Sequence, residues 1–147
     1  MRTLTDEDFR RLRDFRSGLR RFQRWSEERA ADEGLTPAQH QLLLTVKGHD
    51  EPAGPTIGDV AYHLLVRHHS AVELIDRAEA VGLVRRKDDD TDHRVVRIEL
   101  TRAGEQKLRA LSALHLEELG RLGPRFRSLW SGLEPSTEKQ KAPPPRR

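Results

Sequence analysis

Residues 56–101, TIGDVAYHLLVRHHSAVELIDRAEAVGLVRRKDDDTDHRVVRIELT, contain the pattern that decides the fold. Thr56 is placed as an N-cap, and residues 57–64 after it carry apolar side chains at helical spacing. A second apolar stripe covers 71–78 and is followed by Gly82, which suits the left-handed conformation found after helices. The stretch therefore predicts two short helices joined by a tight turn.

A two-stranded ribbon with a polar tip is predicted after the second helix. Residues 83–86 and 95–100 have strand-like composition, and apolar residues alternate along the second of these segments. Residues 87–93 between them, KDDDTDH, contain no apolar side chain, so this tip must project from the core. Helix, turn, helix and ribbon are the parts of a winged helix-turn-helix, which reads DNA with a helix in the major groove and with its wing. The predicted fold is thus mostly α, with a small β-ribbon.

The polar face of the second helix supplies the candidate DNA-binding residues. In a helix-turn-helix, the N-terminal residues of this helix reach the base edges. The candidates are Arg67, His68, His69, Ser70, Glu73 and Arg77. Arginine, histidine and serine can hydrogen-bond with base edges, and a glutamate can accept from a cytosine amino group. A solvated helix face is the alternative interpretation, and the adjoining ribbon favours the DNA-binding one.

Arg94 is the candidate DNA-binding residue of the ribbon. It lies where the second strand leaves the tip, two residues after Asp92. We expect Asp92, together with Arg86, to fix the pose of Arg94, so that its guanidinium loses little entropy on entering a narrow A·T-rich minor groove. The alternative is that Arg94 only pairs with the aspartates of a solvated turn.

These motifs, taken in order, resemble the MarR family (multiple antibiotic resistance regulators). The matching residues are Leu35-Thr36-Pro37-Ala38-Gln39, Leu74-Ile75-Asp76-Arg77-Ala78-Glu79, Gly82-Leu83-Val84, Arg86, Asp89, Asp92-His93-Arg94 and Leu100-Thr101-Arg102-Ala103-Gly104. Two positions depart from the family pattern: Ala78 replaces a usual leucine, and His68-His69 replaces a commoner small polar pair. The histidine pair lies among the candidate base-reading residues, so it bears on which operator sequence the protein prefers.

The resemblance implies a homodimeric regulator of transcription, a repressor that binds double-stranded DNA at a pseudo-palindromic operator. It also implies a small amphipathic effector, often phenolic, in a pocket between the dimerisation helices and the DNA-binding lobe. No residue of this chain can be assigned to that effector from the sequence. Target genes and the direction of regulation are not encoded in any motif.

Long amphipathic segments flank the DNA-binding motifs. Thr5 opens a helix that is predicted to end at Gly34, and Thr101 opens another that Gly123-Pro124 is expected to break before a short last helix. In the family, such terminal helices interleave between protomers. We expect one domain over 1–133, with a DNA-binding lobe at 35–102, dimerisation helices at 5–33 and 102–133, and a disordered tail at 134–147.

The composition agrees with a small protein whose core is shared between two subunits. Hydrophobic and charged residues each make up 35% of the 147 residues, which is lean for a monomer. The net charge is only +3, so the motifs and not a basic patch carry the DNA interpretation. The chain has no cysteine, which excludes disulfides and thiol-based sensing. No apolar run has membrane-spanning length, so we expect a soluble, cytoplasmic protein.

Enzyme and metal sites have weaker support. No nucleophile elbow, phosphate loop or dinucleotide fingerprint is present, so we expect no enzyme and no cofactor. A calcium-loop spacing is matched by Asp88, Asp90, Asp92 and Glu99, but His93 stands where that loop requires glycine. Three histidines could bind a transition metal but have no convincing carboxylate partner at helical spacing, so DNA contact or surface exposure is the favoured interpretation: His63, His68 and His69. The alternative function is a winged-helix module for protein–protein contact or RNA binding.

Overall fold

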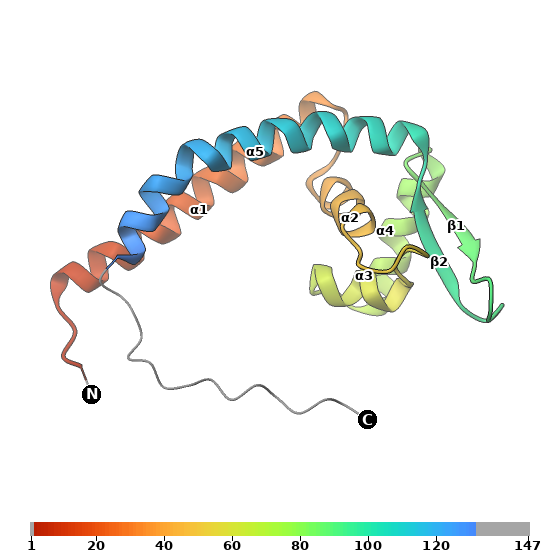
Figure 1. The fold of residues 1–147 in the computed structure, drawn as a ribbon, viewed down its shortest axis with the longest axis horizontal. Coiled ribbons are helices and arrows are strands. Elements are labelled where there is room, and N and C mark those ends of the chain that lie inside the picture. Colours follow the sequence, from red (N-terminus) through yellow and green to blue (C-terminus); the bar gives the residue numbers. More distant parts are fainter. Residues whose placement is uncertain (1, 132–147) are drawn as a thin grey trace.

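The computed structural model describes residues 2–131, which form five helices and one two-stranded antiparallel sheet (Figure 1). In chain order these are α1 (Asp6–Asp32), α2 (Pro37–Lys47), α3 (Ile57–Leu64), α4 (His68–Ala80), β1 (Val84–Asp88), β2 (Val96–Leu100) and α5 (Arg102–Trp130). The two long helices α1 and α5 run side by side, and the other elements form a lobe at one end of them (Figure 1). The predicted fold class is confirmed. The predicted tail lies outside the described residues.

Threonines start four of the helices in residues 2–131. The caps of α1, α2, α3 and α5 are Thr5, Thr36, Thr56 and Thr101, and each side chain accepts a hydrogen bond from the backbone three residues later. The first three caps also form reciprocal capping boxes with the residue at that position. Because a cap of this kind stabilises a helix by about 1 kcal/mol, these threonines fix where the helices begin.

The core of the lobe lies where α2, α4, the ribbon and the N-terminal half of α5 meet. Its fully buried side chains include Leu42, Leu43, Val60, Ala71, Ile75, Ala78, Ile98 and Leu111. Burial of each larger aliphatic side chain contributes about 1.5–3 kcal/mol, so this cluster holds the lobe to α5. No helix within residues 2–131 is long and apolar enough to cross a membrane.

The helix α5 continues through Pro124, so the prediction that Gly123-Pro124 breaks it is wrong. Proline removes one backbone hydrogen bond and crowds the preceding turn, which normally kinks or ends a helix. Here the turns after the proline are packed on α1. The ring of Phe126 lies edge-on to Phe15, with 5.9 Å between centroids, and lies against Gly18. These contacts offset the loss at Pro124, and α5 appears as one curved helix in Figure 1.

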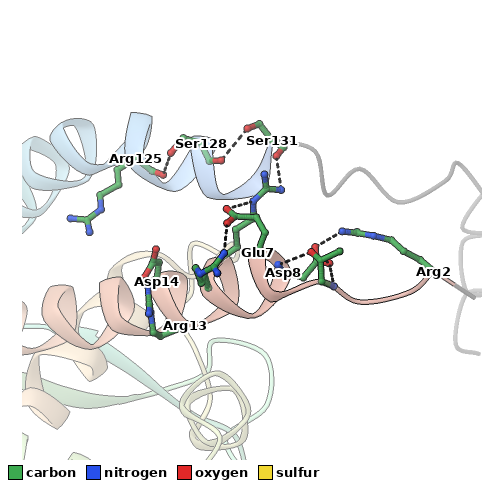
Figure 2. Close-up of polar contacts among 11 residues, drawn as sticks. Arg2, Glu7, Asp8, Arg13, Asp14, Arg125, Ser128 and Ser131 are labelled. Atoms are coloured by element: carbon green, nitrogen blue, oxygen red, sulfur yellow. Dashed lines mark hydrogen bonds and ion pairs between the residues drawn. The ribbon is translucent and has the colours of Figure 1, made fainter.

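Polar contacts secure the far ends of α1 and α5 (Figure 2). The Asp8 carboxylate accepts a hydrogen bond from the Thr5 N–H at 2.9 Å and forms an ion pair with Arg2. Hydrogen bonds from the Thr5 backbone and side chain lower the pKa of Asp8 below its usual value. The Ser131 backbone carbonyl accepts from the Arg11 guanidinium at 3.4 Å, which links the last turn of α5 to α1.

Candidate nucleic-acid interface

The predicted readers lie together on the exposed face of α4. His68, His69 and Ser70 form its first turn, and Glu73 and Arg77 follow one and two turns after His69. All of these side chains are exposed except that of Ser70, which is half-buried. The opposite face of α4 is buried against the core through small and aliphatic residues. The helix therefore presents one polar stripe to solvent, with its densest part at the N-terminus.

The N-terminus of α4 lacks the side-chain cap that the other helices have. Arg67 occupies the cap position in an extended conformation and makes no capping hydrogen bond. The first backbone N–H groups of α4 therefore have no side-chain acceptor, and they carry the positive end of the helix dipole. Such a terminus suits a phosphate oxygen, and the exposed Arg67 adds a full positive charge beside it.

The ribbon has the predicted antiparallel pairing, from Val84 opposite Leu100 to Asp88 opposite Val96. The first strand extends two residues further toward the tip than predicted. The ribbon is anchored by the buried side chains of Val84 and Ile98, and its tip points away from the rest of the lobe (Figure 1).

Asp89 organises the ribbon tip, a role that the motif alone did not reveal. Its carboxylate accepts hydrogen bonds from the Thr91 hydroxyl (2.8 Å), the N–H groups of Thr91 and Asp92 (3.2 and 3.0 Å) and the Arg97 guanidinium (3.0 Å). These donors, with the Thr91 hydroxyl first, lower the pKa of Asp89 to about 2. The carboxylate therefore stays ionised and closes the tip into a fixed loop.

Arg97 joins this loop to the rest of the lobe. Its guanidinium also donates to the Gly54 carbonyl at 3.1 Å and to the Glu51 carboxylate at 3.3 Å. Arg97 was not predicted as part of the site, although an arginine beside Ile98, on the strand that returns from a run of aspartates, was a usable signal.

Asp92 holds Arg94 as predicted. The Arg94 Nε and Nη2 atoms each donate to one Asp92 carboxylate oxygen at 3.1 Å, and the Arg94 N–H donates to the same group at 3.0 Å. The Arg94 side chain nevertheless stays 90% exposed. Its hydrogen bond is the main cause that lowers the pKa of Asp92. The guanidinium is thus oriented on the wing and still accessible to a phosphate or a groove.

Arg86 does not hold Arg94, and that part of the prediction is wrong. The Arg86 guanidinium donates to Glu79 at 2.8 Å and to Asp76 at 2.5 Å, and its backbone N–H donates to Glu79 at 2.9 Å. Both carboxylates belong to α4, and they lie nearer to this position of β1 than the tip does. Arg86 therefore fixes the ribbon to α4.

The polar residues considered as metal ligands are engaged otherwise or lie apart. The carboxylates of Asp92 and Glu99 are paired with Arg94 and Arg85. Among residues 2–131, no group of three histidine, aspartate or glutamate side chains is arranged to hold a metal ion.

A cavity of about 350 Å³ lies between α1 and α5. Its lining includes Phe22, Trp25, Phe126, Arg21, Arg121 and Arg125. The cavity lies along the paired long helices, whereas the family resemblance implied an effector pocket at their junction with the DNA-binding lobe.

Comparisons with known proteins agree with the motifs. Residues 33–95 match the model of the MarR family. AbsC, a MarR family transcriptional regulator from Streptomyces coelicolor, superposes with a TM-score of 0.69 at 22% identity, over 90% of this chain and 87% of AbsC. MepR of S. aureus, in its complex with DNA, gives 0.65 at 21% identity, over 84% and 85%. YusO of Bacillus subtilis gives 0.60 at 22% identity, over 81% and 83%.

None of the curated proteins matches the chain. The members of the matching family are transcription regulators and not enzymes. Residues 33–95 therefore resemble the MarR family, and the chain has the winged helix-turn-helix fold of solved MarR transcription regulators.

Proposed function

We propose that this protein is a homodimeric repressor that binds a pseudo-palindromic DNA operator. The observation that carries the proposal is the juxtaposition of a polar, uncapped α4 N-terminus with a wing arginine that is oriented and exposed. Each protomer would place α4 in one major groove and Arg94 in the adjoining minor groove. Two protomers related by a twofold axis would read the two half-sites of the operator.

The base contacts are assigned to the first turns of α4. His68, His69 and Ser70 would meet base edges, Arg77 would donate to a base or a phosphate, and Glu73 would accept from a cytosine amino group. Arg67 and the free N–H groups beside it would bind a phosphate and position the helix. Because His68 and His69 differ from the family pattern, the operator of this protein should differ at the base pairs they meet.

The homodimer is supported by apolar side chains left exposed on the long helices. On α1 these are Phe9, Leu12 and Leu19, which are 57%, 56% and 41% exposed, and on α5 they include Leu116 at 72%. Full burial of each such side chain against a second copy would contribute about 1.5–3 kcal/mol. The core within one chain is small, so this added burial would be a large share of the total stability.

Response to a small ligand is part of the proposal. The cavity between α1 and α5 combines aromatic rings with arginines and with the carboxylates of Asp14 and Glu118, which suits an amphipathic molecule. A ligand that binds better to one arrangement of the two subunits would change the spacing of the two α4 helices and hence operator affinity.

The test is selection of bound duplexes from a random library, followed by titration of the selected operator at several salt concentrations. A regulator of this kind should select an inverted repeat and bind it 10³-fold or more above random duplex, on the order known for specific DNA binding. Arg94→Ala should reduce the dependence of affinity on salt by about one ion and remove any preference for A·T-rich flanks.

Arg109→Ala is the matched control, because Arg109 is another exposed arginine paired with a carboxylate, but lies on α5. It should leave operator affinity unchanged. Absence of any selected sequence would refute the proposal in favour of the alternative winged-helix functions.

A further inference from the structure

Three helices in this chain end with the same backbone motif. In each, a residue two or three positions after the end of the helix donates its N–H to the carbonyl five residues earlier, and the residue before this donor is left-handed. The bonds run from Leu35 to Ala30 (2.9 Å), from Val66 to Ala61 (3.1 Å) and from Leu83 to Ala78 (2.9 Å). The left-handed residues are Gly34, Leu65 and Gly82, with φ of 74°, 55° and 77°. The end of α3 is therefore the one that places a side chain where the others have glycine.

Leucine is a costly residue at that place. A left-handed backbone brings the Cβ atom against the following carbonyl, which disfavours this conformation by about tenfold or more for a side chain of this type. Leu65 is the one residue other than glycine with positive φ in the described range 2–131. Nothing in the turn requires leucine, because glycine forms the same hydrogen bonds at the other two helix ends.

Burial does not offset that cost. The residues equivalent to Val66 at the other two ends, Leu35 and Leu83, are both only 4% exposed and belong to the core. Val66 is 41% exposed, and Leu65 is 90% exposed. Both side chains of the turn thus face solvent, so folding gains little hydrophobic free energy from either.

The position of the turn suggests a use for these side chains. The turn directly precedes α4, whose exposed first residues are His68 and His69. Figure 1 shows α3 and the ribbon tip on the side of the lobe away from α5. A surface that places α4 in the major groove therefore brings Leu65 to the edge of the same groove. The thymine C5-methyl is the apolar group that the four bases display there.

We infer that Leu65 contacts a thymine methyl group in each half-site and is a specificity-determining residue, with Val66 shielding the contact from water. The inference rests on the proposed function and deepens it by naming one base that the operator should contain. A leucine that is exposed in the free protein becomes buried in the complex, so the hydrophobic gain appears only on binding the correct base. The disfavoured backbone is retained because it holds the side chain outward.

The test uses the selected operator and variants in which single thymines are replaced by deoxyuridine, which lacks only the C5-methyl group. Binding is measured for wild type, Leu65→Asn and Leu65→Met. At the contacted position, loss of the methyl should weaken the wild type about fourfold, the value for one buried methyl-sized group. Leu65→Asn should bind the thymine operator more weakly than wild type does, and deoxyuridine at the contacted position should not weaken its binding further. Leu65→Met should still lose affinity when that thymine is replaced by deoxyuridine.

Two measurements separate contact from misfolding. Asparagine tolerates the left-handed backbone, so Leu65→Asn should melt at the wild-type temperature or a few degrees above it. Val81→Asn, a change at an exposed apolar residue at the other end of α4, should leave the response to deoxyuridine intact. A Leu65→Asn protein that keeps wild-type affinity, or that still distinguishes thymine from deoxyuridine, would overturn the inference. Failure of the wild type to bind any selected duplex would instead refute the proposed function.

Discussion

Replacement of Gly104 by alanine tests how α5 is joined to the lobe formed by α2, α3, α4 and the ribbon. Gly104 lies in the first turn of α5 against the segment that follows α4. A Cβ atom at this position would lie 2.1 Å from the Leu83 carbonyl oxygen and 3.0 Å from its carbon. The same oxygen accepts a hydrogen bond from the Thr101 N–H at 3.1 Å, and the Thr101 hydroxyl donates to the adjacent Gly82 carbonyl at 2.5 Å. Both ends of the Thr-x-x-Gly spacing thus act on the Leu83 carbonyl: Thr101 donates a hydrogen bond to it, and Gly104 leaves space for it.

The geometry sets the size of the effect. Real Cβ contacts do not fall below 3.0 Å, so the helix and the Leu83 backbone must separate by about 0.9 Å, the difference from 2.1 Å. Overpacking of this kind costs about 1–3 kcal/mol. Weakening the two Thr101 hydrogen bonds adds about 0.5–1.5 kcal/mol each, and the better helix propensity of alanine returns at most about 1 kcal/mol. The free energy of unfolding should therefore fall by about 1–5 kcal/mol.

Urea denaturation of the full chain, at one fixed protomer concentration, measures this change. Gly58→Ala is the control, because its added methyl meets nothing closer than the Thr56 hydroxyl at 3.7 Å. It should raise the free energy of unfolding by about 0.5–1 kcal/mol, as alanine does in place of a helical glycine. Operator affinity of Gly104→Ala should also fall, since the angle between α5 and the lobe changes. A Gly104→Ala protein within about 0.5 kcal/mol of wild type would refute the reasoning.

Three further changes test the ribbon and the recognition helix. Hydrogen bonds, chiefly from the Thr91 hydroxyl, lower the pKa of Asp89 from its ordinary value of 3.8 to about 2. The stability that ionised Asp89 contributes is therefore fully present above pH 3.8 and is lost as the pH falls through 2. Wild type should therefore lose thermal stability between about pH 4 and 2, and Asp89→Asn, less stable at neutral pH, should lack that step. Arg86→Met keeps an apolar stem but frees the ribbon from α4. It should lower stability by only about 0.5–1 kcal/mol, because its partners are largely exposed, and should reduce operator affinity in the same titration. Arg67→Ser should stabilise α4 by about 1 kcal/mol through a new cap yet weaken operator binding, which denaturation and titration together would show.

Local chemistry made most of the fold predictable. Threonine followed three residues later by an acidic or amide residue is a local signal of a helix start, and α1, α2 and α3 begin directly after such threonines. The ribbon was likewise predictable from its polar tip and from the alternation of apolar residues along β2, without knowledge of the tertiary structure. The pair formed by Asp92 and Arg94 was predictable for the same reason, because the two residues are close in sequence and face the same side.

The errors occurred where a distant segment decides the outcome. Pro124 should end a helix on local grounds, but Phe126 after it packs on α1, which lies more than one hundred residues earlier in the chain. The partners of Arg86 lie on α4, and two partners of Arg97 lie in the loop before α3. Sequence identifies the charges in such networks, but only the packing of the ribbon on the lobe determines which carboxylate each arginine meets.

The segment between α3 and α4 combines two departures from good local structure. Its left-handed residue is Leu65 where the chain elsewhere uses glycine, and the cap of α4 is Arg67 where the chain elsewhere uses threonine. Each departure sacrifices about 1 kcal/mol of local stability, and both fall within the few residues before the predicted readers. Sequences that otherwise obey local rules tend to break them where function makes a competing demand. An exposed leucine and an exposed arginine, beside free N–H groups and two histidines, form a surface suited to the methyl groups, phosphates and base edges of a major groove. The coincidence of these features supports DNA binding at this turn more strongly than any one of them alone.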